Sequence, residues 1–592
     1  MTYSNKKGDT TQAYMNNQLR EAHKELQEEG KHLTDQIREL GYKDLTIQEF
    51  LEIKPDLKKG QKKASQTAAL QDKCQKLLQR KKDLDNTIII EPSRLPAIVD
   101  AAEKILINNR ECNIYQRAGK LVHITKIGKI SQRKKNKLKR PNDAIVIREV
   151  DQAFLTVLLT KIGHFKKVDG RSNEIKKIDC PERISRYLIA KQSWNLPILT
   201  GIINAPTLRA DGSILDTPGY DTESGILFIP DAWNFEKIPQ EPTHEDAKKA
   251  LCKIEYILKE FPFEDDASKS VIIAAMLTAL IRKSISTAPL FGITAPKMAS
   301  GKSLLADAIS LIAIGKENSV IAQAENEAEE KKRIMSILMN GDPIVCYDNI
   351  EKPFGSAPLC AVLTQLEYKD RILGGNETRT VPTNTTFLAT GNNLVFIGDT
   401  STRTLLCKLD PRVERPEERS FDLILCEYIP ENRSQLVKAC LTILRAYHLA
   451  DRPKKEGIKQ FGRFEEWSNW IRGAIIWVGL ADPCETRKEI ENADPIRMLL
   501  GNLLYSWYKI FCNKSVKTRT VISTAMKRLD EDHEVLLESI KELLPNKRGE
   551  ISNVAFAKKL VSFKGRIENG YRLEHMGTYQ GTALWSVKKL QK

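Results

Sequence analysis

The sequence predicts a multidomain protein of the α+β and α/β classes, built around an α/β core that carries a phosphate-binding loop. Apolar segments of strand length at 290–293, 343–347 and 385–389 alternate with apolar helical segments. The run Ala-Pro-Lys-Met-Ala-Ser-Gly-Lys-Ser at 295–303 joins the first strand to a helix. Short apolar runs broken by turn residues precede this core, and segments of helical length follow it.

Changes in composition and in the spacing of apolar residues divide the chain into five expected regions. The first is polar and highly charged with leucine and isoleucine at helical spacing, which predicts either a coiled-coil hairpin or a tethering arm. The last places helices before two short strands around Gly577 and Gly581, the order of a winged helix that binds DNA or packs against protein. The expected domains are a charged helical region (1–87), a β-rich accessory or DNA-binding domain (88–240), the P-loop core with its preceding helices (241–412), a helical lid region (413–513) and a winged helix (514–592).

Composition favours an anionic partner and argues against a membrane protein. The 592 residues carry a formal net charge of +16, which favours nucleic acid. Eight lysines or arginines and no acid lie between Lys126 and Arg140, which indicates either a solvated loop or a phosphate-contacting patch. We take Arg133, Lys134 and Lys135 as DNA-binding candidates.

Location and redox state follow from the same composition. The longest apolar run, Val271–Ile281, is too short to span a bilayer, and the first residues lack an apolar signal core. Eleven cysteines are scattered without a C-x-x-C pair, which predicts no disulfide framework and no zinc site. A cytoplasmic protein with no membrane partner is expected.

The loop at 295–303 has the residue types that hold nucleotide phosphates. Backbone N–H groups at the start of a helix cradle phosphates, Lys302 reaches the terminal ones, and the Ser303 hydroxyl ligates Mg²⁺. Pro296 stands where the usual pattern has its first glycine, so an ordinary strand–turn–helix is the alternative. The expected cofactors are ATP and Mg²⁺, with the nucleotide held by Ala299, Ser300, Gly301, Lys302, Ser303 and Leu304.

Further polar residues follow the loop in the order that a nucleotide site needs. Asp348 ends an apolar strand and is the second expected Mg²⁺ ligand. Asn392 and Asn393 end another strand, where an amide can hydrogen-bond the attacking water or the γ-phosphate. Arg403 comes just before a further strand, and in a ring such an arginine can enter a neighbouring site.

These motifs, in this order, resemble the AAA+ helicase-type ATPase module found in replication proteins of phages, plasmids and integrated mobile elements, where it is often fused to a primase. The likeness extends from about residue 90 to the end of the chain. It includes Asp370–Gly374, Glu466-Trp467 with Trp470 to Arg472, 482–487, and upstream 205–208 and 216–220. The resemblance implies a ring-forming homo-oligomeric motor on DNA, single-stranded or forked.

The resemblance also implies roles for single residues. Lys302 and Ser303 would contact phosphate and Mg²⁺, Asp348 would be the second Mg²⁺ contact, Asn392 the sensor amide, and Arg403 the trans-acting finger. Asn349 departs from the glutamate that many AAA+ ATPases use to polarise water, since an amide accepts a proton poorly. We therefore include Asn349 among the catalytic candidates as a residue that positions water.

Two short strands around a turn at 374–376 are expected between Asp348 and Asn392. Helicase-type rings often place a DNA-contacting hairpin there, which makes Lys369, Arg371 and Arg379 pore candidates. Arg371 is alternatively a residue of a subunit interface.

The sequence favours a replicative or self-loading DNA helicase of a mobile element over two other readings. The first alternative is a DNA-binding AAA+ initiator or switch that hydrolyses slowly, and the second is a structural P-loop scaffold. A primase within the chain is not expected, because neither Asp83 with Asp85 nor 530–533 has a suitable setting. A primase or another replication protein is instead a possible partner.

Overall fold

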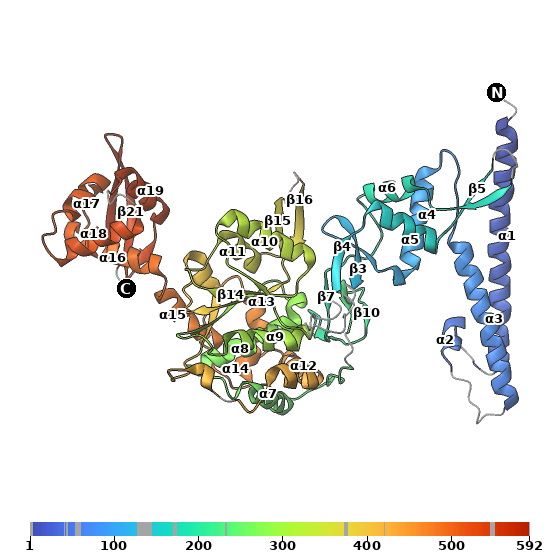
Figure 1. Cartoon of the computed structure of the whole chain (residues 1–592), viewed down its shortest axis with the longest axis horizontal. Helices are drawn as coiled ribbons and strands as arrows, with labels where there is room; N and C mark the ends of the chain where they lie inside the picture. The colour runs from blue at the N-terminus through green and yellow to red at the C-terminus, as the bar shows by residue number, and fades with distance from the viewer. Residues whose placement is uncertain are drawn as a thin grey trace, which may run out of the picture. The chain divides into compact units, whose positions relative to one another are not determined.

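The computed structural model describes residues 4–40, 42, 45–53, 61–126, 145–169, 174–230, 234–371, 377–419, 421–544 and 551–590. The chain divides into two compact units, residues 1–199 and 200–592 (Figure 1). This boundary falls inside the expected 88–240 domain, and the five-part division stays a prediction. Arg133, Lys134 and Lys135 lie outside the described residues. None of the described helices is long and apolar enough to cross a membrane.

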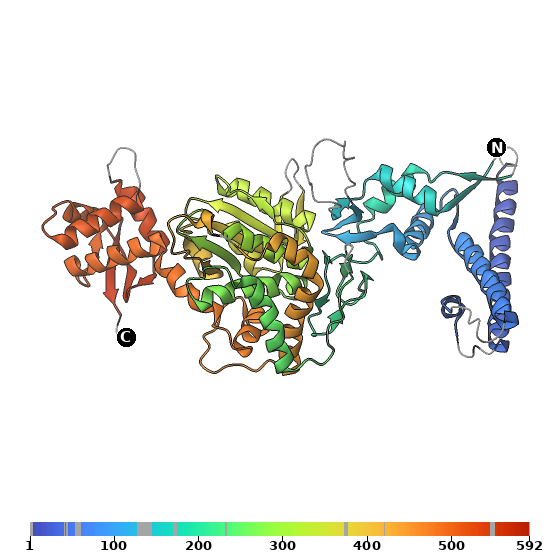
Figure 2. The ribbon, with the colours of Figure 1, turned by 60° about the horizontal axis from the view of Figure 1, so that its bottom comes forward.

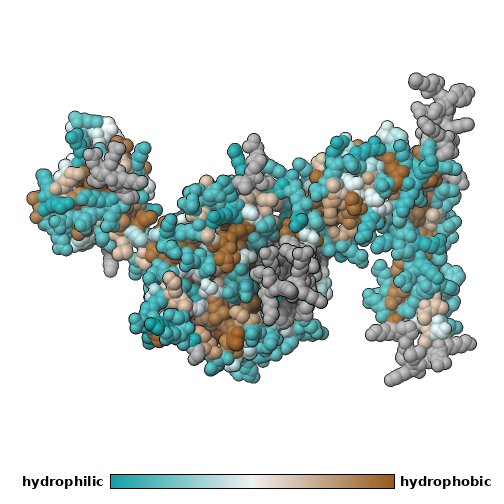
Figure 3. All heavy atoms as spheres, in the orientation of Figure 1, coloured by the Kyte–Doolittle hydropathy of each residue, from teal (hydrophilic) through white to brown (hydrophobic). Residues whose placement is uncertain are grey.

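Two long helices, α1 (Ser4–Glu39) and α3 (Gln61–Asp85), lie side by side at the start of the first unit (Figures 1 and 2). The short helix α2 (Ile47–Leu51) packs Phe50 into the same apolar seam. An ion pair between Arg80 and Glu29 bridges the two long helices at 2.9 Å. Most described side chains of α1 and α3 are exposed, and the face of these helices in view is mostly hydrophilic (Figure 3).

The rest of the first unit mixes helices with short strands. Its three helices bury one apolar core around Phe165 and Leu159. The expectation of a β-rich region does not fit this part, because apolar residues at 98, 102 and 105 have helical spacing that nearby turn residues obscure. The elements are β1 (Thr87–Ile89), α4 (Leu95–Asn108), η2 (Arg110–Cys112), β2 (Ile114–Arg117), β3 (Lys120–Lys126), β4 (Ile145–Glu149), α5 (Gln152–Ile162), β5 (His164–Val168), β6 (Ile175–Ile178) and α6 (Glu182–Ala190), with strand orders β1-β5-β6 and β2-β3-β4.

The second unit begins with turns and brief strands, as expected for 201–229. An ion pair between Arg209 and Asp221 at 2.9 Å holds these turns together. Two helices follow, and nearly every residue of the second is buried, as its uniformly apolar sequence predicts. The elements are β7 (Gly201–Ile203), β8 (Thr207–Leu208), β9 (Ile214–Leu215), β10 (Gly219–Tyr220), β11 (Ile226–Phe228), α7 (His244–Leu258), α8 (Asp266–Ile281) and η3 (Arg282–Ser284).

A five-stranded parallel sheet forms the core of the second unit, with strand order β13-β14-β17-β12-β18. Helices flank this sheet (Figure 2). All six residues of β12 are buried, as a central strand of a parallel sheet requires. The elements are β12 (Leu290–Ala295), α9 (Lys302–Ile314), β13 (Ser319–Ile321), α10 (Glu327–Asn340), β14 (Ile344–Ile350), α11 (Ala357–Thr364), β17 (Thr386–Asn392), η4 (Gly398–Arg403) and β18 (Thr404–Lys408).

A helical region follows the sheet, and the motif residues 466–487 hold it in place. Trp467 Nε1 donates to Thr278 Oγ1 of α8 at 2.9 Å, and Glu466 accepts the Ser286 N–H at 2.7 Å. Arg472 donates from Nε to Asp482 Oδ1 at 2.8 Å. The elements are η5 (Pro416–Glu418), α12 (Leu425–Leu449), α13 (Glu465–Trp467), the π-helical turn η6 (Ser468–Arg472), α14 (Gly473–Trp477), η7 (Pro483–Thr486) and α15 (Arg487–Asn492).

The C-terminal part has its own core around Trp507 and Trp585. Helix α16 (Pro495–Phe511) packs into this core, so the structure places here a helix that the sequence assigned to the region ending at 513. Asp530 Oδ1 caps α18 by accepting the His533 N–H at 3.0 Å, which gives this acidic segment a structural role. The other elements are β19 (Val516–Lys517), α17 (Thr518–Ala525), α18 (Glu531–Leu543), α19 (Asn553–Phe563), β20 (Ile567–Glu568), β21 (Tyr571–Tyr579) and β22 (Thr582–Lys589), with strand order β19-β22-β21-β20.

Candidate functional site

The phosphate-binding pattern forms a tight turn between β12 and α9. Gly301 precedes the helix with φ 95°, and a Cβ there would lie 3.0 Å from Phe261, so both conformation and space require glycine. Ala299 also adopts a left-handed conformation, with φ 55°. The buried Ser300 hydroxyl donates to Lys297 O at 2.8 Å. Ser300 can therefore offer only its backbone N–H to a phosphate without breaking this turn.

Strand register brings the predicted residues to the carboxyl edge of the sheet. Asn392 of β17 pairs with Ala295, the last residue of β12. Lys302 Nζ donates to Asn392 Oδ1 at 2.8 Å and to Lys297 O at 3.0 Å. Ser303 is exposed on the first turn of α9. The helix start, a lysine, a hydroxyl and an amide thus share one edge, where α/β sheets bind ligands.

Asp348 is held at the same edge by a residue that sequence reasoning did not assign. Thr390 Oγ1, on the neighbouring strand β17, donates to Asp348 Oδ1. The β14–β17 pairing has an irregularity after Tyr347, and Asn349 there has φ 53°. This bulge turns the end of β14 and leaves Asn349 exposed, with its Nδ2 donating to Glu351 Oε1 at 3.3 Å.

The electrostatics of this edge suit an anionic ligand with a divalent cation. Burial lowers the pKa of Lys302 from its ordinary value, and the Asp348 carboxylate opposes that shift. A desolvated lysine gains more than an exposed one from pairing with phosphate. Asp348 and Ser303 offer the hard oxygen ligands that Mg²⁺ prefers, so the residues present fit this ion.

Arg403 lies at the opposite edge of the sheet. It ends η4, directly before Thr404, which pairs with Leu290 at the amino end of β12. Because β12 has six residues, a rise of ~3.3 Å per residue separates the two edges by about 17 Å. The structure therefore groups Lys302, Asp348 and Asn392 and leaves Arg403 apart from them.

The segment between β14 and β17 includes the expected pair of strands, β15 (Glu367–Arg371) and β16 (Thr378–Pro382). Lys369 and Arg371 are exposed on β15. Arg379 lies opposite Asp370 and pairs with Glu377 at 3.4 Å, and its side chain is only 10% exposed. The turn residues 372–376 lie outside the described part of the chain.

A small apolar cavity adjoins the phosphate loop. It lies between the end of α7, the first turn of α9 and the segment before α12, and its lining includes Tyr256, Phe261, Leu304, Phe421 and Leu423. Leu304 directly follows Ser303, so this apolar surface begins one residue from the expected phosphate contacts. The sequence identified Leu304 alone, because the other residues are brought together by tertiary packing.

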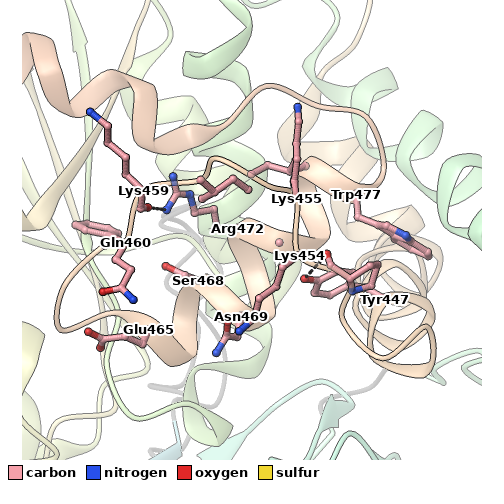
Figure 4. Close-up of a pocket in the computed structure, with 15 residues that line it drawn as sticks. Tyr447, Lys454, Lys455, Lys459, Gln460, Glu465, Ser468, Asn469, Arg472 and Trp477 are labelled. Carbon is pink, nitrogen blue, oxygen red and sulfur yellow. Dashed lines mark hydrogen bonds between the residues drawn. The ribbon is translucent and has the colours of Figure 1, made fainter.

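A larger cavity of about 540 Å³ lies in the helical region, away from every sequence-predicted site residue (Figure 4). Arg472 donates there to Lys459 O at 2.7 Å, and the Tyr447 hydroxyl donates to Pro453 O at 3.4 Å. Because Arg472 is also paired with Asp482, its charge is already compensated. The side chains of Arg472 and Tyr447 therefore hold the backbone of the loop at 453–459.

Comparisons with known proteins give only distant likenesses. No protein-family model matches the chain, and no curated protein matches it. Among solved structures, it is similar to the apo C-terminal region of NrS-1, at 13% identity over 74% of this chain and 100% of that chain, with a TM-score of 0.32. It is also similar to the active helicase Cch of SCCmec type IV, at 11% identity over 75% of this chain and 90% of that chain, with a TM-score of 0.33. The JCV helicase matches at 11% identity over 43% and 74%, with a TM-score of 0.19.

Proposed function

We propose that this chain is an ATP-driven DNA motor of the AAA+ helicase type, a replicative or self-loading helicase of a mobile element that works as a ring on single-stranded DNA. One observation carries the proposal: Lys302, Asp348 and Asn392 meet at one edge of the sheet, while Arg403 lies directly before β18 at the other. A copy of the chain with this arrangement needs a neighbour to supply an arginine. Such a motor would act in the cytoplasm, with a primase or another replication protein as a partner.

In the proposed reaction, the chain binds ATP at the carboxyl edge of the sheet. The N–H groups from Ala299 to Leu304 and Lys302 Nζ hold the phosphates. Bound Mg²⁺, held by Ser303 and Asp348, would neutralise charge on the phosphate oxygens. Thr390 keeps the Asp348 carboxylate oriented for that task.

Hydrolysis requires water to attack the γ-phosphorus as the bond to the bridging oxygen of ADP breaks. Asn392 can orient that water or the γ-phosphate from the end of β17. Asn349 can also orient it but accepts a proton poorly, so positioning and charge stabilisation carry most of the rate increase. The products are ADP, inorganic phosphate and a proton released to solvent.

Three surfaces support DNA as the partner. Lys369 and Arg371 are exposed on the β15–β16 pair that we propose to line the pore. The helices and the β21–β22 hairpin of the C-terminal part fit a winged helix, with α19 before the wing. In the first unit, β5 and β6 place Lys166 opposite Lys177, and such facing like charges favour an anionic partner.

A slow ATP-dependent switch or initiator is the second candidate function. Asn349 favours it, because this residue replaces the expected proton acceptor and already donates to Glu351. A switch would bind ATP and DNA and assemble without separating strands.

Unwinding of a forked DNA duplex by the purified full-length chain tests the proposal. We expect ATP-dependent strand separation by the wild type and none by Lys302→Ala or Arg403→Ala. DNA-stimulated ATP hydrolysis without unwinding would favour the switch. Equal inactivity of all three proteins in both assays would contradict the motor.

A further inference from the structure

A second arginine, Arg463, shares a cavity with Arg403 at the amino edge of the sheet. The cavity measures about 540 Å³ and lies between α11, η4 and the loop before α13. Asp399 is the one carboxylate among its described lining residues. The polar and charged residues that line it include Ser356, Thr364, Asp399, Thr400, Arg403 and Arg463.

The backbone of Arg463 is fixed in a strained conformation. Its φ of 71° lies in the left-handed region, which is costly for an arginine. Its N–H donates to Glu465 Oε1 at 3.1 Å, and its carbonyl accepts the Thr287 hydroxyl at 2.7 Å. Thr287 lies just before β12, so these bonds anchor Arg463 at the amino end of that strand. Strain of this kind persists where surrounding contacts hold it, often at functional sites.

The described lining of this cavity has two arginines and one carboxylate, so one positive charge is in excess. Arg403 pairs with Asp399 at 3.4 Å, an exposed carboxylate. Arg463 is exposed and has no ion pair among the described residues, whereas the buried Arg472 has its own partner in Asp482. Two guanidinium groups against one carboxylate fit an anion with several oxygens, such as a terminal phosphate.

We infer that Arg463 is a second trans-acting arginine that, beside Arg403, contacts the terminal phosphate of the nucleotide held by the phosphate loop of a neighbouring copy. This inference rests on the proposed function. Neither arginine can serve the loop of its own chain, because both lie at the amino end of β12 and the loop lies at its carboxyl end. As water attacks the γ-phosphorus and ADP departs, both arginines keep their protons and stabilise the negative charge.

Steady-state ATP hydrolysis by single variants gives the first test. We expect Arg463→Ala to lower kcat by ~10²-fold, the loss typical of removing one transition-state donor, with little change in ATP affinity. Arg463→Lys should restore part of the rate, because it keeps the charge but loses the planar fork. Lys459→Ala is the matched control, since this exposed lysine lies in the same loop but lines the other cavity. Wild-type activity of Arg463→Ala would overturn the inference.

Mixing variants before ring assembly separates a trans role from a structural one. Arg463→Ala mixed with Lys302→Ala should regain activity, since about one interface in four of a randomly mixed heterologous ring joins an intact loop to intact arginines. Arg463→Ala mixed with Arg403→Ala should stay inactive, because no interface then has both arginines.

The controls of this mixture distinguish failure of the trans role of Arg463 from failure of the proposed ATP-driven motor. If Arg403→Ala complements Lys302→Ala but Arg463→Ala does not, Arg463 acts within its own chain and the inference is wrong. If the wild type does not hydrolyse ATP, the proposed function itself fails.

Discussion

The two edges of the parallel sheet differ in the charged and polar side chains that they carry. At the carboxyl edge, Lys302 meets an amide and lies near a carboxylate. At the amino edge, Arg403 and Arg463 share a cavity whose described lining has one carboxylate, Asp399. About 17 Å of buried strand separates them. In the proposed motor, this difference assigns phosphate binding to the carboxyl edge and charge stabilisation to the amino edge, and the distance keeps one copy of the chain from using both on one nucleotide.

Removing the guanidinium from the amino edge should have the largest effect. We expect Arg403→Ala to lower kcat for ATP hydrolysis by about 10³-fold, as for trans-acting arginines in other phosphoryl-transfer enzymes, while ATP affinity changes little. Steady-state kinetics and nucleotide titration measure the two quantities. Arg38→Ala is the control, since this arginine is 60% exposed and lies on α1 of the first unit. Loss of ATP binding in Arg403→Ala would contradict the proposed difference between the two edges, because the amino edge would then be needed to hold the nucleotide.

The carboxyl edge should respond in the opposite way. Lys302→Ala should abolish measurable ATP binding and, with it, ATP turnover, because its Nζ is the cation that lies beside Asn392 at that edge. Titration with a fluorescent ATP analogue measures the loss. Lys297→Ala serves as the control, because its Nζ donates to Glu414 O rather than toward Asn392. Unchanged binding in Lys302→Ala would show that the loop does not hold phosphate.

Arg472 should behave as a structural arginine, in contrast to Arg403. Arg472→Ala leaves the Asp482 carboxylate without its partner and should lower the free energy of unfolding by about 3–5 kcal/mol. Urea denaturation measures this change. Arg415→Ala, which removes an exposed pair with Glu418, should cost about 1 kcal/mol or less. Equal free energies of unfolding for the two variants would contradict a structural role for Arg472.

Thr390 should tune metal affinity without affecting the fold strongly. Thr390→Val removes the hydroxyl that orients Asp348, and we expect the Mg²⁺ concentration for half-maximal ATP hydrolysis to rise by about 10–100-fold. Thr294→Val is the matched control on β12, since that hydroxyl accepts the Leu394 N–H instead. A similar shift in both variants would point to general disruption of the sheet.

The smallest expected effect concerns pH. Burial raises the pKa of Glu330 above its ordinary value of 4.5, and this carboxyl accepts a hydrogen bond from the Tyr347 hydroxyl. The protonated form therefore stabilises the fold at acid pH, and this contribution is lost as pH rises through the raised pKa. Glu330→Gln keeps an acceptor for Tyr347 and cannot ionise.

Thermal unfolding between pH 4 and pH 8 measures the consequence for Glu330. We expect Glu330→Gln to gain about 1 kcal/mol or less over the wild type at neutral pH and to lose that advantage at acid pH. A constant difference at all pH values would show that Glu330 does not titrate in this range.

Sequence reasoning identified residues that follow strands and missed those placed by tertiary packing. Lys302, Asp348 and Asn392 were predictable, because carboxyl ends of parallel strands share an edge. Thr390 lies two residues before Asn392 on the same strand, but only the β14–β17 pairing reveals its hydrogen bond to Asp348. Arg463 had no local signal, since its position depends on a contact with Thr287, distant in sequence.

The helices also divide into those with a clear signal in the sequence and those without one. The uniformly apolar helix α8 and the periodic helix α16 were predictable from the length and spacing of their apolar residues. The helices α4 and α5 were not, because short apolar runs beside turn residues fit strands equally well. The motif residues Glu466 and Trp467 supported a family resemblance, yet their contacts are structural, which spacing along the chain cannot reveal.

Complementation between two inactive variants tests the two-edge account most directly. Lys302→Ala has an intact amino edge and Arg403→Ala has an intact carboxyl edge, so a mixed ring includes some complete interfaces. We expect ATP hydrolysis to reappear at up to about one quarter of the wild-type rate when the two are mixed before assembly. Persistent inactivity of the mixture, with both variants folded and assembled, would contradict the account.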